Sequence, residues 1–394
     1  MPPSLAPNFK PGPDAHKHIV VIPSWYDAGR GSGGGYFRDQ ALALQAAGHR
    51  VAILVPQIYS RRDIGAGRAP VSPALTVEDD GVEVYRMARP VLLPRMPYRN
   101  ALLWSRCGLR LFAAYVERNG IPDLVHAQSC LNAGVLAAAV RRRYGLPFIL
   151  TEHSTGFDQQ RLRWWERDLI RRVAAKAAAR IAVSPHLAGL LQAQFGGVWH
   201  YVPNILNQAF VEEPVPQRRH EGFAFVCAAR MSPVKNHPLL LHAFADAFAG
   251  DTEVRLVLAG DGPLRRDLEQ LCRDRGIARQ VVFCGTLPAE QLRDVMAACD
   301  AFVLASDVES FGVVVIEAQA VGLPVVCTAS GGPDHLIGEA DGLLAPVGDR
   351  ARLAAALSEI RSQADRYDRA AIRARALRTY GPQAFADAFA ALAP

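Results

Sequence analysis

The sequence contains no long apolar run. Half of its 394 residues are hydrophobic and 21% are charged, yet no segment approaches the roughly 20 consecutive apolar residues that a membrane-spanning helix needs. Residues 1–17 are rich in proline and lack an apolar stretch of signal-peptide length. We therefore expect a disordered leader over residues 1–17 and a cytoplasmic protein.

Cysteine is scarce, and the cysteines stand singly in apolar stretches. They form no C-x-x-C pair and have no histidine at metal-ligand spacing, which argues against a structural zinc site. No D-x-D pair of aspartates follows a predicted strand, so a divalent metal is not expected. We expect no other cofactor. We interpret the seven cysteines as reduced core residues, namely Cys107, Cys130, Cys227, Cys272, Cys284, Cys299 and Cys327.

A nicotinamide-binding fingerprint is also missing. Residues 29–35 are rich in glycine and precede a helical pattern from Tyr36, so backbone amides there could approach an anion. A nicotinamide site would also need an acidic residue at the end of the second predicted strand, where Pro56 and Gln57 stand instead. A flexible loop is the alternative interpretation of the glycines.

Charge is unevenly distributed along the chain. Residues 1–205 hold 25 Lys and Arg against 14 Asp and Glu, a net +11, whereas residues 206–394 hold 19 against 24, a net −5. A basic first half could meet nucleic acid, anionic lipid or a phosphorylated acceptor, or it could be a solvated surface without a partner.

Short β-rich runs alternate with helical patterns from end to end, which predicts an α/β fold with parallel sheets. The length of the chain favours two domains. Strands are predicted at residues 18–23, 50–56, 124–128, 148–152 and 181–184 of an N-terminal domain over 18–205. After a proline-rich linker at 206–221, a C-terminal domain over 222–375 has strands at 223–229, 254–259, 281–284, 301–304, 324–328 and 342–345.

Two charged pairs stand out in the second half. Arg230 and Lys235 follow its first predicted strand, where a guanidinium could fork two phosphate oxygens and an ammonium could add a point charge. Glu309 and Glu317 flank a loop-to-helix junction, where a carboxylate suits sugar hydroxyls and the amides of residues 310–313 suit phosphate. Surface charges and an ordinary acidic helix start are the alternatives.

Together these stretches closely resemble retaining glycosyltransferase family four, which has the GT-B architecture of two facing Rossmann-like domains with a cleft between them. The family signature E-x7-E corresponds to Glu309 and Glu317, and its R-x-x-x-x-K loop to Arg230 and Lys235. The sequence LAGDGP at residues 258–263 continues the match. In the first half, the glycine loop and the Thr-Glu-His sequence that ends at His153 fit the same family.

The resemblance implies a role for each matched residue. Arg230 and Lys235 would neutralise the diphosphate of the donor, Glu317 would bind the ribose, and Glu309 would bind the transferred sugar. His153 would face the reacting centre, so that His153, Glu309, Arg230 and Lys235 form the expected catalytic set. The expected donor-binding residues are Gly33, Gly34, Gly35, Arg230, Lys235, Glu309, Ser310, Phe311, Gly312, Val313 and Glu317.

The resemblance also implies the reaction. It is transfer of a sugar from a nucleoside diphosphate sugar to a hydroxyl of a glycan or lipid-linked acceptor, in bacterial cell-surface polysaccharide assembly and without a metal. An epimerase or phosphorylase of the same architecture and a non-catalytic nucleotide-sugar-binding protein are the alternatives. Gln128 departs from the pattern, because relatives often carry a second histidine there. Residues 376–394 are expected to pack back on the N-terminal domain.

A basic amphipathic helix is predicted over residues 160–173. Its apolar face would contain Leu162, Trp165, Leu169 and Val173, and a second face would contain Arg163, Arg167 and Arg171. Together with the net charge of the first half, this pattern favours an anionic membrane surface as a further partner, on the inner face of the membrane, and no nucleic acid. A core-facing apolar stripe with solvated arginines is the alternative.

Overall fold

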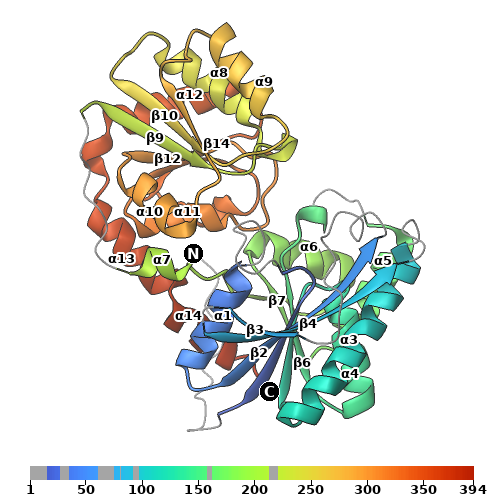
Figure 1. Ribbon diagram of the computed structural model, residues 1–394. Helices are drawn as coiled ribbons and strands as arrows, with labels where there is room; N and C mark the ends of the chain where they lie inside the picture. Colours follow the sequence, from blue (N-terminus) through green and yellow to red (C-terminus); the bar gives the residue numbers. More distant parts are fainter. Residues whose placement is uncertain are drawn as a thin grey trace. The chain divides into compact units, whose positions relative to one another are not determined.

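The computed structural model of the chain describes residues 16–26, 35–60, 75–79, 81–91, 97–157, 162–212 and 221–394. The chain divides into two α/β units, each with a sheet of its own (Figure 1). Unit 1 comprises Met1–Pro203 and Pro382–Pro394, and unit 2 comprises Asn204–Gly381. The predicted α/β class with two Rossmann-like domains is confirmed.

Unit 1 is built on an eight-stranded sheet in the order β3-β4-β2-β1-β5-β6-β7-β8. Its strands are parallel except that β3 runs antiparallel to β4. β5 and β6 are buried along their whole length, as expected for strands covered on both faces. The strands are β1 (His18–Pro23), β2 (Arg50–Ser60), β3 (Leu75–Asp79), β4 (Val82–Val91), β5 (Leu124–Gln128), β6 (Phe148–Glu152), β7 (Ala179–Ala182) and β8 (His200–Tyr201).

Helices cover both faces of this sheet. On one face, α1 (Gly35–Ala46) packs against the C-terminal helix α14 (Pro382–Ala390) (Figure 1). On the other face, α3 (Pro97–Asn119), α4 (Ala133–Tyr144), α5 (Trp164–Ala174) and α6 (Pro185–Phe195) contact one another in chain order, with the 3-10 turn η1 (Thr155–Phe157) beside α6.

The last helix, α14, belongs to unit 1 although the residues before it belong to unit 2. Phe385 and Phe389 are buried, and the ring centroids of Phe389 and His126 lie 4.8 Å apart. The chain crosses between the units at Pro382, so residues 376–381, which we expected in the returning segment, complete α13 in unit 2. Pro382 has no amide proton to continue the hydrogen-bond ladder of α13, and this separates the two helices.

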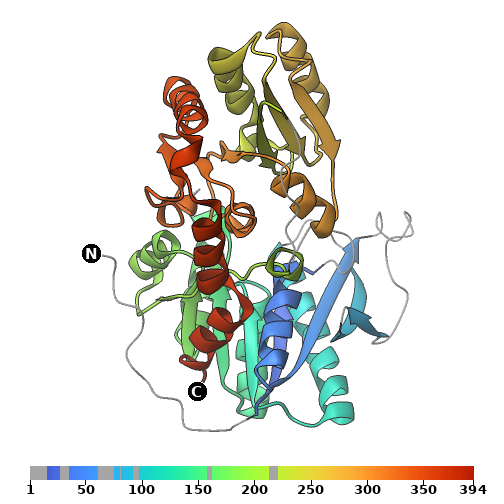
Figure 2. The same ribbon diagram turned by 90° about the vertical axis from the view of Figure 1, so that its left-hand side faces the viewer.

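Unit 2 is built on a six-stranded parallel sheet in the order β11-β10-β9-β12-β13-β14. Helices α8, α9 and α12 cover one face, and α10 and α11 cover the other, with α13 against α11 (Figures 1 and 2). The strands are β9 (Phe223–Ala228), β10 (Val254–Ala259), β11 (Val281–Gly285), β12 (Ala301–Leu304), β13 (Val325–Thr328) and β14 (Gly342–Ala345). The helices are α8 (His237–Phe248), α9 (Arg265–Asp274), α10 (Ala289–Ala297), α11 (Val313–Ala320), α12 (Arg350–Ser362) and α13 (Arg369–Tyr380), with 3-10 turns η2 (Pro233–Lys235), η3 (Pro333–His335) and η4 (Ala364–Arg366).

The segment expected to be a linker contains a short helix, α7 (Gln208–Val211), which is part of unit 2. Asn207 caps it by accepting a hydrogen bond from the amide of Ala209 at 3.0 Å. The guanidinium of Arg293 donates to the carbonyl of Ala209 at 3.2 Å, and that of Arg373 donates to the carbonyl of Phe210 at 3.3 Å. These side chains satisfy carbonyls of a helix too short to satisfy its own, so unit 2 begins at Asn204 rather than after residue 221.

The basic helix predicted over residues 160–173 begins at Trp164, after Arg163 as its cap; residues 160 and 161 lie outside the described part. Its buried residues are Ile170, Val173 and Ala174, so Val173 is the one member of the predicted apolar face that is buried. Leu162 precedes the helix, and Trp165 and Leu169 are partly exposed. Arg167 is partly exposed and its guanidinium lies over the ring of Phe195, 5.8 Å from the centroid, whereas Arg171, one turn further along the helix, is exposed.

All seven cysteines are free, and all except the partly buried Cys284 are buried, which confirms them as core thiols. In the ranges described above, no helix combines the length and the apolar character that a membrane span requires.

Candidate active site

The loop after β9, which carries Arg230, is held against the loop after β10 by backbone contacts. The amides of Ala229 and Met231 donate to the carbonyls of Ala259 and Asp261, both at 3.0 Å. A Cβ atom at Gly260, whose φ is +139°, would lie 2.1 Å from the carbonyl oxygen of Ala229. Only glycine permits this approach, which explains the LAGDGP sequence: it sets the backbone on which the predicted phosphate-binding cations stand.

Lys235 and Glu309 lie in direct contact. The ammonium Nζ of Lys235 donates to Oε1 of Glu309 at 2.5 Å, and the hydroxyl of Ser306 donates to the same oxygen at 2.7 Å. Glu309 is buried, whereas the Lys235 side chain is partly exposed. A buried carboxylate needs such a partner, because removal from water would otherwise be costly. The structure thus brings together two residues that are 74 positions apart in the sequence.

A second link joins the same two loops. Asn236, at φ +45°, caps α8 by accepting a hydrogen bond from the amide of Leu239, and its Nδ2 donates to Oδ1 of Asp307 at 2.7 Å. The amide of Asp307 donates to the carbonyl of Val234 at 2.9 Å. Asn236, Asp307 and Ser306 were not among the predicted site residues. Asn236 was the one with a sequence signal, because asparagine is a common cap at the start of a helix.

The chain after Glu309 leads into the start of α11. Gly312, at φ +96°, caps α11, so the helix begins at Val313. Glu317 therefore lies about one turn inside the helix, because the left-handed backbone at Gly312 prevents an earlier start. The first amides of α11, including that of Val313, have no acceptor within the helix and form its positive end.

The remaining predicted donor-binding residues of unit 2 differ in exposure. Arg230 is exposed, and no ion pair within the described residues involves it. Ser310 and Glu317 are partly exposed. The side chain of Phe311 is 1% exposed and packs near the rings of His335 and Tyr380, so only the backbone of this residue could meet a ligand.

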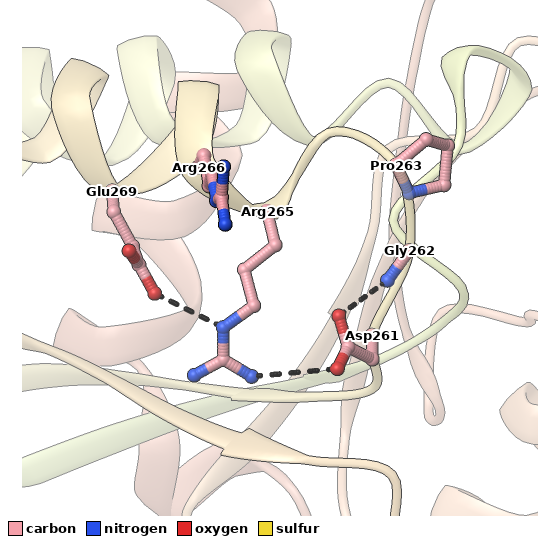
Figure 3. A pocket seen from close by; sticks show the side chains of 6 residues that line it. All are labelled: Asp261, Gly262, Pro263, Arg265, Arg266 and Glu269. Atoms are coloured by element: carbon pink, nitrogen blue, oxygen red, sulfur yellow. Dashed lines mark hydrogen bonds and ion pairs between the residues drawn. The ribbon is translucent and has the colours of Figure 1, made fainter.

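An open depression of about 520 Å³ lies beside the Arg230 loop (Figure 3). Its polar side chains are paired with one another: Arg265 donates to Glu269 at 3.0 Å and lies 3.9 Å from Asp261. None of the predicted donor-binding residues lines it, so we do not assign it to the donor. The lining residues are Asp261, Gly262, Pro263, Arg265, Arg266 and Glu269.

In unit 1, His153 directly follows β6 and is buried. Its Nε2 lies 2.7 Å from Oε1 of Gln128, the last residue of the neighbouring strand β5. The ring packs among Trp25, Tyr36 and Phe37, with centroid distances of 6.4, 5.1 and 5.4 Å. Gly35 is the first residue of α1, whereas Gly33 and Gly34 lie outside the described residues.

The carboxylate of Glu152, beside His153, is held by backbone amides and by the hydroxyl of Ser129, which donates to Oε2 at 3.4 Å. It accepts hydrogen bonds from the amides of Cys130, His153 and Ser154 at 2.8, 2.9 and 2.8 Å. Desolvation and this carboxylate raise the pKa of Tyr36 above its ordinary range. Glu152 is the middle residue of the Thr-Glu-His sequence, but no role was predicted for it. Its role is to tie the loop after β5 to the loop after β6.

The predicted site residues therefore form two groups at carboxyl ends of strands. Arg230, Lys235 and residues 309–317 gather beyond β9 and β12 in unit 2, and His153 stands beyond β6 in unit 1. In the part of the chain that the structure describes, no group of three His, Cys, Asp or Glu side chains is arranged to hold a metal ion.

Both halves of the chain match known protein families. Residues 211–377 match the family model for glycosyl transferases group 1, and residues 31–204 match the glycosyl transferase 4-like domain. D-inositol 3-phosphate glycosyltransferase of Frankia alni is 29% identical over 371 residues, which cover 85% of this chain and 88% of that protein. TuaC of Bacillus subtilis, named as a teichuronic acid biosynthesis glycosyltransferase, is 26% identical over 352 residues, which cover 83% of this chain and 84% of TuaC.

A solved structure, HepE of Anabaena in complex with UDP, is similar at a TM-score of 0.72 and 18% identity, covering 95% of this chain and 98% of that chain. At this identity the similarity concerns the fold. Together, the two family matches and the relatives favour a glycosyltransferase over an epimerase, a phosphorylase or a non-catalytic binding protein. The chain belongs to glycosyltransferase family four, with the GT-B fold.

Proposed function

We propose that this glycosyltransferase moves a sugar from a nucleoside diphosphate sugar to a hydroxyl of a glycan or lipid-linked acceptor, with retention of the anomeric configuration. The observation that carries the proposal is the contact between Lys235 and Glu309 beside the positive end of α11. Departure of a diphosphate concentrates negative charge on phosphate oxygens, and fixed cations and amides stabilise that charge.

Each member of this group has a task in the proposed reaction. Lys235 and the exposed Arg230 pair with the diphosphate, and the amides of Gly312 and Val313 add hydrogen bonds to it. Glu309 binds hydroxyls of the transferred sugar through the oxygen that Lys235 and Ser306 leave available. Glu317 binds the ribose, and His153 contributes from unit 1. No metal is needed, because cations and helix amides act on the leaving group.

Two similar proteins guide the choice of substrates to test. HepE was solved with UDP, so UDP-sugars come first among the donors to be tested. TuaC is named for teichuronic acid biosynthesis, which supports a role in assembling a bacterial cell-surface polysaccharide.

A thermal-shift screen over UDP-, GDP- and ADP-sugars tests the donor. A ligand that binds only the folded protein at 100 times its Kd adds about 2.7 kcal/mol of stability. A stabilising nucleotide sugar should then be hydrolysed or transferred by the purified enzyme. If no nucleotide sugar raises the melting temperature and none is consumed by the enzyme, the proposed donor class is wrong.

The outer face of α3 supports a second proposal, that unit 1 docks on an anionic membrane surface. Leu102 and Leu103 are 42% and 40% exposed, and Arg99, Arg106 and Arg110 lie on the same side of the helix by their spacing. The opposite side, with Trp104, Leu111 and Phe112, is buried. Exposed leucines flanked by arginines fit an interface in which each basic residue contributes about 1 kcal/mol.

Sedimentation with vesicles tests this docking. The protein should sediment with anionic but not neutral vesicles at low salt, and Arg106→Glu with Arg110→Glu should abolish the binding. A matched control reverses Arg352 and Arg378, two exposed arginines of unit 2. Equal binding to both vesicle types, or equal loss in the control variant, would remove the membrane role.

A further inference from the structure

Gln128 is the centre of a buried hydrogen-bond network in unit 1. It is 0% exposed, and its side-chain amide contacts three groups on three elements. Nε2 of Gln128 lies 2.7 Å from Oε1 of Gln40 on α1 and 3.3 Å from Nδ1 of His126 on β5. Oε1 of Gln128 lies 2.7 Å from Nε2 of His153.

The hydrogen bonds of this network agree with one assignment of donors and acceptors. Nε2 of His126 lies 2.8 Å from the hydroxyl of Thr151, and complete burial lowers the pKa of His126 to about 3, so this ring is neutral. A neutral imidazole that donates from Nε2 accepts at Nδ1. The two amide protons of Gln128 then go to His126 and Gln40, which leaves Oε1 as an acceptor for His153.

We propose that Gln128 is a positioning residue that holds the proton of His153 on Nε2. An amide oxygen accepts a hydrogen bond but does not take the proton at neutral pH, whereas a histidine at the same place could donate or accept. The inference rests on the proposed function in one respect, namely that His153 serves the reacting centre. The tautomer itself does not depend on that role.

Among the residues that the structure describes, three titratable groups lie near His153. They are His126 on β5, Glu152 on β6 and Tyr36 on α1. His126 is neutral, the carboxylate of Glu152 is occupied by three backbone amides, and the pKa of Tyr36 is raised by burial. The acceptor of the Nε2 proton is therefore the Gln128 oxygen, 2.7 Å away.

Long-range ¹H–¹⁵N correlation spectra of the full chain, labelled in its histidines, test the tautomer directly. His153→Gln identifies the signals of His153 among the 11 histidines. At neutral pH the native protein should show His153 protonated on Nε2 alone. Gln128→Met should give a mixture of both tautomers. The Nδ1-protonated form in the native protein would overturn the proposal without any reference to activity.

Gln280→Met is the matched control. Gln280 is also buried, and its Nε2 donates to three backbone carbonyls of unit 2, those of Phe248, Asp251 and Val254. Its loss should lower stability without changing the His153 signals. If both variants change the tautomer alike, Gln128 has only a general structural role.

Gln128→Glu adds a readout that bears on catalysis. A carboxylate next to the Nε2 proton stabilises the imidazolium, so the His153 titration should move to higher pH by about 1 unit or more. The acid limb of the pH–rate profile should move with it if His153 serves the reaction. An unmoved titration overturns the inference, whereas a moved titration with an unmoved rate profile contradicts only the assigned role of His153.

Discussion

The two groups of site residues satisfy their polar atoms in different ways. In unit 2, Glu309 is neutralised by the ammonium of Lys235, a partner that a ligand can displace or share. In unit 1, the Glu152 carboxylate is held by three backbone amides, and His153 is held by an uncharged amide. Unit 2 therefore offers charge to an anionic ligand, whereas unit 1 offers an imidazole of defined orientation.

The largest expected effect breaks the charged group. Lys235→Ala should lower turnover by about 10²–10³, the usual loss when one donor to a developing anion is removed. It should also lower stability, because the buried carboxylate of Glu309 loses its charged partner. Initial rates and thermal unfolding measure the two effects.

The double variant Lys235→Ala with Glu309→Gln separates these effects. It removes the buried charge as well as the ammonium, so stability should recover while turnover stays low. Wild-type turnover in Lys235→Ala would show that the leaving group is stabilised elsewhere.

A second variant breaks the neutral group instead. Glu152→Ala leaves three backbone amides without their acceptor and should cost about 3 kcal/mol or more of unfolding free energy. Glu166→Ala is the control, since Glu166 accepts from the single exposed amide of Arg163 and should cost about 1 kcal/mol. Denaturant unfolding decides, and equal losses would contradict the structural role of Glu152.

Glu317→Ala should have a smaller and different effect. It removes a contact that we assign to the ribose in both the ground state and the transition state, so the donor KM should rise about tenfold with little change in kcat. Glu290→Ala, at an exposed position of α10, should leave both constants unchanged. A fall in kcat at constant KM would place Glu317 at the leaving group instead.

Removal of metal ions should have no effect on the transfer rate. Treatment with EDTA should leave the transfer rate unchanged, because we assign stabilisation of the diphosphate to Arg230, Lys235 and the amides of α11. Loss of activity with EDTA, restored by magnesium or manganese, would contradict that assignment.

Much of the arrangement was predictable from local patterns. The β-rich runs at residues 124–128 and 148–152 became β5 and β6, because each begins with apolar residues that are buried in a sheet covered on both faces. The hairpin of β3 and β4 was missed. β4 carries charged residues at Glu83, Arg86 and Arg89 and lies next to the edge strand β3, which gives a weaker signal than a buried strand.

The site was predictable only in part. Arg230, Lys235, Glu309 and Glu317 were found through a family pattern, but the contact between Lys235 and Glu309 depends on the pairing of β9 with β12. Ser306 and Gln128 carry no charge and belong to no spacing pattern, and Asn236 is marked only as a possible helix cap, so the sequence does not identify them as partners of the charged residues.

The sequence by itself determined most of the strands and helices and where glycine had to stand, because burial on a strand and close backbone approach act on each residue locally. Only the tertiary structure decided where unit 2 begins, which face of α5 is buried and which groups share a proton or a charge. These depend on side chains that meet across strands far apart in the chain, and a hydrogen bond exists only when both partners are brought within reach.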